Sequence, residues 1–236
     1  MRTKRYCLFL LSIFVFVLFT NTMVVNAMNT GFETSSLPSE EKTKFISGIN
    51  LLPLNEEPGK TTIMSFDVNS NRLIAIGQNT SSRKRICVYS DEGVFQYGYT
   101  FNCTGDFGVE WDDENLNIFF VRSDVIVSVT PSGEVLDALE VQDTIENNSY
   151  VYQFIHSTKR VVGDTEYFLG NDLGILNLFS LSYSQITVKD SVGTENVIYD
   201  VGSTQLYNAI GNIGFLSLFI FAAVIAWRVI KLSRGN

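Results

Sequence analysis

The sequence predicts an all-β ectodomain preceded by an N-terminal signal helix and held by one C-terminal transmembrane helix. Three observations support this prediction. Two apolar runs lie near the two ends of the chain. Between them, short segments rich in branched and aromatic residues alternate with turns of Asp, Asn, Ser and Gly, which is typical of β-strands. Of the 236 residues, 45% are hydrophobic and 13% are aromatic, a composition that excludes an intrinsically disordered chain.

Residues 1–27 have the features of a secretory signal peptide. Three basic residues open the chain, and an apolar stretch over 7–19 follows that only Ser12 interrupts. Val25 and Ala27 stand at the −3 and −1 positions of a cleavage site after Ala27. We therefore expect export, with an uncleaved N-terminal anchor as the alternative.

Residues 209–230 are predicted to form the transmembrane helix. The run carries no charge before Arg228, and at about 1.5 Å per residue it is long enough to cross a hydrocarbon core of about 30 Å. Arg228, Lys231 and Arg234 come at its end, and basic flanks stay on the cytoplasmic side. We expect a single-pass protein of the cell membrane with its N-terminus outside, residues 209–230 in the lipid bilayer, and residues 231–236 as a short basic cytoplasmic tail.

The region between these ends divides into two parts. Residues 28–60 are polar at first and are predicted to form a mobile arm to about residue 42, followed by one lead-in strand over 46–54. Residues 61–208 are predicted to form the β domain. Its expected strands form two four-stranded units and one looser unit: 62–68, 72–77, 84–89 and 94–101; then 107–111, 116–121, 124–129 and 134–141; then a hairpin over 161–167 with strands 184–189 and 195–199.

The first two units repeat a common pattern of apolar residues and turn glycines. The matching pairs are Val68 with Trp111 and Leu73 with Leu116, at an offset of 43, and Ile86 with Ile126 and Gly93 with Gly133, at an offset of 40. If the units are equivalent sheets, the members of each apolar pair occupy equivalent buried sites. The two glycines then lie in the turn between the third and fourth strands.

The segments FDVNSNRLIAIG…KRICVYSDEGVF and VEWDDENLNIFFVRSDVIVSVTPSGEVL resemble NHL-type β-propeller repeats. The resemblance covers residues 61–142 well and 158–200 weakly. It implies a propeller-like array of four-stranded antiparallel units, about three blades and not a complete ring, since propellers have about 4–8 blades. The uncovered sheet edges and blade faces then need the N-terminal arm, residues 143–183 or another chain to cover them.

Charge restricts the partners of the central region. All 25 acidic residues of the chain lie there with 11 of its basic residues, which gives a net charge of −14. Binding to phosphate backbones needs Lys and Arg. This balance argues against nucleic acid as a partner and against docking on anionic lipid.

The sequence predicts no catalytic, cofactor-binding or metal-binding residue. His156 is the only histidine, and we expect it to be an ordinary polar residue at a strand end. Asp112 and Glu114 could bind Ca²⁺ through carboxylate oxygens, but they lack the spacing of an EF-hand loop and fit a solvated turn better. Cys87 and Cys103 are expected as two buried free thiols, with a disulfide as the alternative that export permits.

Three segments match the N-glycosylation pattern and would be acceptors in a eukaryotic host. They begin at Asn79, Asn102 and Asn147.

The expected function is a non-catalytic binding or interaction module on the outer face of the membrane, with an unknown ligand. A second hypothesis is a subunit that completes a β assembly with another copy or another exported protein. A third is an enzyme of the sugar-lactonase or glycan-acting kind. An enzyme requires acidic and amide side chains that converge at one end of a ring, and an assembly subunit requires a bare apolar blade face. A monomeric binder has both faces covered and a concave, aromatic-lined surface.

Overall fold

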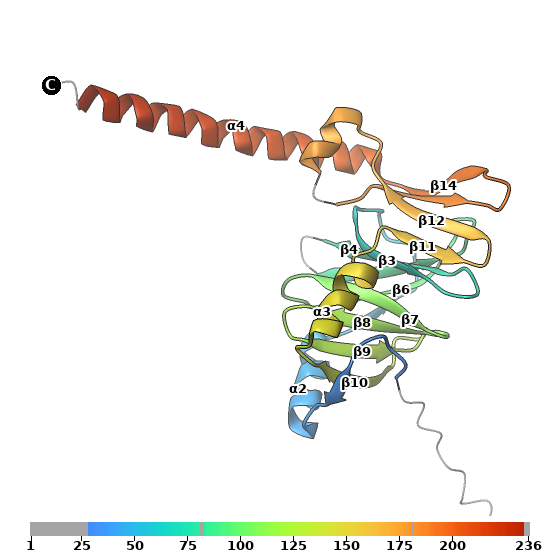
Figure 1. Cartoon of the computed structure of the whole chain (residues 1–236). Helices are drawn as coiled ribbons and strands as arrows, with labels where there is room; N and C mark the ends of the chain where they lie inside the picture. The colour runs from blue at the N-terminus through green and yellow to red at the C-terminus, as the bar shows by residue number, and fades with distance from the viewer. Residues whose placement is uncertain (1–27, 81–82, 181, 234–236) are drawn as a thin grey trace, which may run out of the picture.

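The computed structural model describes residues 28–80, 83–180 and 182–233, with side chains as far as Trp227 (Figure 1). This part of the chain contains fourteen strands in three antiparallel sheets and a long apolar helix at its C-terminal end. The sequence therefore predicts the mostly β fold correctly. The expected signal helix over 1–27 and the end of the expected tail lie outside the described residues.

Each sheet contains a four-stranded meander in which consecutive strands are paired. The first sheet is formed by β3 (Ile63–Val68), β4 (Ile74–Asn79), β5 (Lys84–Tyr89) and β6 (Phe95–Phe101), with β2 (Leu52–Leu54) at the edge beside β6. The second sheet is formed by β7 (Phe107–Asp112), β8 (Asn115–Phe120), β9 (Val125–Val129) and β10 (Val135–Val141), with β1 (Thr34–Ser36) beside β10. The third sheet is formed by β11 (Lys159–Val162), β12 (Thr165–Gly170), β13 (Gln185–Lys189) and β14 (Glu195–Asp200).

The first sheet lies between the other two (Figure 1). Ile86 and Phe101 belong to the core that it shares with the second sheet, whereas Phe66 and Tyr89 belong to the core that it shares with the third. Successive side chains of a strand point to opposite faces, so a sheet covered on both faces needs apolar residues at nearly every position. The order of the sheets in space is therefore third, first, second, which differs from their order along the chain.

The three meanders share one turn. Gly93, Gly133 and Gly193 have φ angles of 78°, 88° and 89°, a conformation that L side chains disfavour. The amide of each glycine donates a hydrogen bond to the carbonyl three residues earlier, at 2.9–3.0 Å. Each lies between the third and fourth strands of its meander. The predicted position of Gly93 and Gly133 is confirmed.

One of the predicted apolar pairs is wrong by one residue. Val68 pairs with Ile74 across β3 and β4, and Trp111 pairs with Leu116 across β7 and β8. Leu116 therefore corresponds to Ile74 and not to Leu73, because the connection from β3 to β4 is one residue longer. Val68 is buried, whereas Trp111 is only partly buried.

The expected mobile arm is replaced by ordered structure. β1 pairs with β10, and helix α2 (Ser39–Ile49) follows. Glu40 and Glu41 lie in its first turn, where negative charge stabilises a helix by interacting with its dipole. Phe32 packs on Phe119 with the ring centroids 4.6 Å apart. Of the lead-in strand expected over 46–54, only β2 is present.

The outer face of the second sheet is covered by α3 (Ile145–Tyr150) and the π-helical turn η1 (Val151–Ile155). Ile155 contributes to this packing and lies over β7 at Gly108. A Cβ at Gly108 would lie 2.2 Å from Cγ2 of Ile155, so only glycine allows this approach. Residues 143–155 thus cover this sheet face. The sequence predicted that the N-terminal arm, residues 143–183 or another chain would cover such faces.

The C-terminal helix α4 (Gly202–Ser233) begins almost directly after β14 and is longer than predicted. Its part from Gly202 to Trp227 is long and apolar enough to cross a membrane. It projects away from the three sheets (Figure 1), and side chains such as Phe215 and Phe219 are about 70% exposed. A helix with this composition that packs so little of its surface on the protein fits a lipid environment.

Candidate functional site

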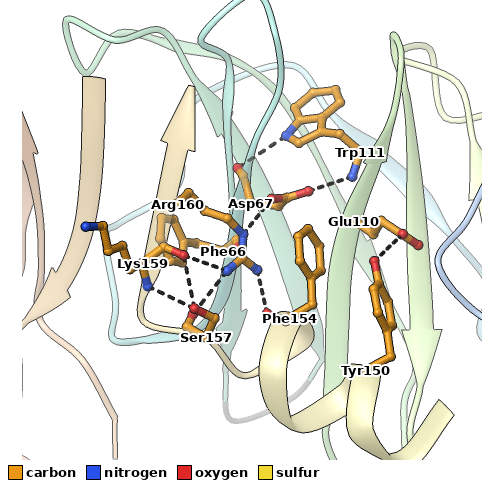
Figure 2. Close-up of polar contacts among 9 residues, drawn as sticks. All are labelled: Phe66, Asp67, Glu110, Trp111, Tyr150, Phe154, Ser157, Lys159 and Arg160. Atoms are coloured by element: carbon orange, nitrogen blue, oxygen red, sulfur yellow. Dashed lines mark hydrogen bonds and ion pairs between the residues drawn. The ribbon is translucent and has the colours of Figure 1, made fainter. Parts of the chain in front are cut away.

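Three charged residues occupy corresponding positions on the first strands of the three meanders. They are Asp67 on β3, Glu110 on β7 and Arg160 on β11. Glu110 and Arg160 each lie two residues before the end of their strand, where the last residue pair precedes a tight turn. Asp67 lies 43 residues before Glu110, the same offset that separates Val68 from Trp111. All three are buried. We call this group the central junction (Figure 2).

Arg160 is fully engaged within the protein. Its Nε donates to Oδ1 of Asp67 at 2.7 Å. Its two terminal nitrogens donate to four backbone carbonyls, those of Phe66, Phe154, Ser157 and Lys159. A guanidinium has five N–H donors, so these five hydrogen bonds use all of them. The guanidinium carbon also lies 4.3 Å from the ring centroid of Phe154, a cation–π distance.

Asp67 connects the third sheet to the second. Its Oδ1 accepts from Arg160, and its Oδ2 accepts from the backbone amide of Trp111 at 2.8 Å. The indole Nε1 of Trp111 donates to the carbonyl of Asp67 at 3.2 Å. Burial raises the pKa of Asp67, and the positive charge of Arg160 opposes this shift. Both partners of the ion pair are 6% exposed, and removing one partner of such a pair is strongly destabilising.

Glu110 ties the N-terminal segment and α3 to the second sheet. Its Oε1 accepts from the amide of Gly31 at 2.9 Å and from the hydroxyl of Tyr150 at 2.6 Å. Its Oε2 accepts from the hydroxyl of Thr30 at 2.6 Å. Burial, followed by the hydrogen bond to Glu110, raises the pKa of Tyr150. The charged groups of the central junction are thus engaged by the chain itself, which suits an organising role between the sheets.

The sequence pattern contained part of the signal for this junction. Asp67 and Glu110 follow the offset of 43 residues that relates Val68 to Trp111. Arg160 was missed because the third unit matches the others only loosely, and because its partner Asp67 lies 93 residues earlier in the chain.

A groove of about 380 Å³ lies between α2 and the second sheet. Its apolar floor is formed by Phe45, Ile49 and Phe120, and its polar rim includes Lys44 and Asn102. The rings of Phe45 and Phe120 meet edge to face, with the centroids 5.2 Å apart. Binding pockets commonly combine an apolar lining with a few polar groups at the rim, so this groove can accept an apolar side chain.

Both cysteines of the described region are free thiols, as expected. Cys87 is buried, and burial raises its pKa to about 11. Cys103 is only partly buried and lies in the wall of the groove. Burial raises its pKa as well, so both thiols stay protonated at neutral pH.

His156 is exposed and follows η1, so its predicted place at a strand end is wrong. Asp112 accepts a hydrogen bond from the amide of Asn29 at 2.9 Å, and Glu114 is exposed in the turn between β7 and β8. Within residues 28–80, 83–180 and 182–233, no group of three or more His, Cys, Asp or Glu side chains is placed to hold a metal ion.

The three glycosylation segments differ in accessibility. Asn147 is 4% exposed. Its Oδ1 accepts from the amide of Glu33, and its Nδ2 donates to the carbonyls of Glu33 and Gln142. Asn79 and Asn102 are exposed. Asn147 therefore serves the fold and is closed to a glycosylating enzyme in the folded protein.

Comparison of the chain with protein-family models, with curated proteins and with solved structures gave no match.

Proposed function

We propose that the chain is a single-pass membrane protein whose β-rich region stands on the outer face of the cell membrane as a non-catalytic binding module. One observation carries the proposal. The groove lies on the second sheet, and α4 leaves the protein beside the third sheet, at the opposite end of the stack (Figure 1). α4 runs across the direction in which the sheets are stacked (Figure 1), so if α4 spans the bilayer, the groove lies to the side of the anchor, where a partner can reach it.

The groove favours one apolar side chain of an exported polypeptide as its ligand. Its aromatic floor supplies apolar and edge-to-face contacts, and the amide and hydroxyl groups of Asn102, Thr104 and Ser123 at its rim can hydrogen-bond a peptide backbone. The net charge of −14 over the central region favours a partner with basic residues near that side chain, because complementary charge steers association.

Photo-cross-linking on intact cells tests this proposal. A photo-cross-linking amino acid in place of Lys44, at the groove, is expected to capture an exported polypeptide. The same amino acid in place of Ile145 is the matched control, since Ile145 is also an exposed helical position but lies on α3. No adduct at Lys44, or equal adducts at both positions, would contradict the proposal.

Topology is tested separately. Protease added to intact cells is expected to cleave within residues 28–208 and to spare only the membrane segment. Protection of the whole central region would place the β domain on the cytoplasmic side.

The alternative, a subunit that completes a β assembly, rests on the outer face of the third sheet. Val161 and Val197 are 57% and 52% exposed on this face, and β14 is an edge strand, which can pair with another chain. The same face carries two ion pairs, Lys159 with Glu166 at 2.6 Å and Lys189 with Glu195 at 3.5 Å. With four charged residues this face is not the bare apolar face that an assembly subunit requires, and this favours the binding module over the assembly subunit.

We infer that the three meanders are blades of an NHL-type, propeller-like array without a complete ring. The shared glycine turns and the corresponding positions of Asp67, Glu110 and Arg160 support this inference. The burial of Asp67 and Glu110, together with their engagement by the chain's own groups, weighs against a glycan-acting enzyme that uses these carboxylates.

A further inference from the structure

The connection from β12 to β13 leaves apolar side chains exposed beside α4. It contains the 3₁₀ turn η2 (Gly174–Phe179), in which Ile175 and Leu178 are 79% and 81% exposed. η2 contacts α4 and lies against its first half (Figure 1). No residue from 173 to 183 is charged. In water this exposure is unfavourable.

Hydrogen bonds hold this connection against the start of α4. Gln205 is 1% exposed, and its Nε2 donates to Oδ1 of Asn171 at 3.1 Å and to the carbonyl of Ser182 at 2.6 Å. About two turns further along α4, Nδ2 of Asn212 donates to the carbonyl of Phe179 at 2.8 Å. The position of η2 along the helix is thus defined by these contacts at both of its ends.

These contacts set the depth of η2 in a membrane. About twenty helical residues cross a hydrocarbon core of about 30 Å. Counted back from Trp227, the last uncharged residue before Arg228, they end near Asn208. Tyr207, 76% exposed, then lies at the outer interface, where Tyr and Trp are enriched. Asn212 lies about one turn inside the hydrocarbon, where an unpaired amide is costly.

We propose that η2 inserts into the outer leaflet, at the boundary between headgroups and acyl chains, as a second membrane contact beside α4. The carbonyl of Phe179 accepts from Asn212 at that depth, which brings the exposed Ile175 and Leu178 into contact with lipid. Burial of apolar side chains drives the insertion. Electrostatic attraction does not add to it, since the acidic β domain has no attraction for anionic headgroups. A single helix leaves the tilt of the β domain free, and a second contact restrains it. The inference rests on the proposed membrane anchor.

Fluorescence of the full chain in phosphatidylcholine nanodiscs tests the inference. An environment-sensitive NBD dye is attached to a single introduced cysteine, L178C or I175C, in a background with C7S and C103S, in which only the buried Cys87 remains. V192C is the matched control, since Val192 is an apolar residue with 87% exposure in the turn after β13. F219C reports on α4 itself. The dye at 178 and at 175 is expected to show blue-shifted emission that nitroxides on the upper acyl carbons quench, whereas the dye at 192 stays in water.

The outcomes separate this inference from the anchor. If the dye at 219 is quenched while those at 178 and 175 behave like the one at 192, η2 lies outside the lipid and the inference is wrong, although α4 still spans the membrane. If the dye at 219 also reports water, α4 does not insert, and both the anchor and the inference fail.

Discussion

Replacing Arg160 with Met should destabilise the protein more than any other charge-removing change on β11. The substitution keeps much of the apolar stem and removes the guanidinium, which leaves the Asp67 carboxylate buried without its counter-charge and removes the hydrogen bonds from Arg160 to four carbonyls. Breaking a buried pair by removing one partner costs about 3–5 kcal/mol. For a chain of this size, that corresponds to a fall of about 6–20 °C in Tm.

The assay is thermal unfolding of the detergent-solubilised full chain, followed by near-ultraviolet circular dichroism. Lys159→Met is the matched control, because Lys159 is adjacent on β11 and its pair with Glu166 is 46% and 36% exposed. Exposed pairs contribute about 0–1 kcal/mol. Combining R160M with Asp67→Leu should recover much of the lost stability, since it removes the unpaired charge. An R160M variant as stable as K159M, or a double variant with purely additive losses, would refute the reasoning.

Three further predictions concern local backbone strain, pH and the anchor. Gly193→Ala should cost about 1–2 kcal/mol in urea unfolding, the cost of a left-handed L residue, whereas Gly93→Ala should cost more, because its Cβ would also lie 2.5 Å from the carbonyl of Ile198; equal losses would contradict this. The Cys87 pKa is raised from 9.0 to about 11, so the folded state holds its proton more tightly. The contribution of this thiol to the free energy of unfolding is fully present below pH 9. As the pH rises toward 11 this contribution is lost, and the loss is at most about 2–3 kcal/mol. Cys87→Ala should therefore show a shallower alkaline loss of stability. Deleting residues 209–236 should release an acidic, soluble protein that carbonate washing removes from membranes, because η2 alone buries too few apolar side chains for stable anchoring; retention would reveal another anchor.

Local patterns in the sequence were enough to predict the strands and turns. Alternation of apolar residues, together with turn residues between the segments, depends on neighbours within a few positions. The twelve meander strands accordingly appear within a few residues of their predicted bounds. Gly93 and Gly133 could be placed for the same reason, since a positive φ is a local demand on the backbone.

Helix α2 shows where such patterns fail. The polar composition up to about residue 42 predicts a mobile arm, and the apolar residues over 46–54 predict a strand. Phe45 nevertheless packs on Phe120, and Lys42 bonds to Asp137. These contacts join residues 75 or more positions apart in the chain, and short helices are stabilised mainly by such tertiary packing. The residues of this segment do not indicate that the second sheet will provide a surface on which the helix can pack.

Local patterns along the chain are enough to predict the mostly β character of the central region, its acidic charge, the turn glycines Gly93 and Gly133, and the apolar run that becomes α4. Long-range packing decides that the third meander lies on the first, that Arg160 pairs with Asp67 while Glu110 binds the N-terminal segment, and that a groove forms between α2 and the second sheet. This division follows from the range of the interactions. Strand alternation and turn geometry are set by adjacent residues, whereas the choice of which sheet faces meet depends on the burial of apolar area and on charge pairing between residues far apart in the chain.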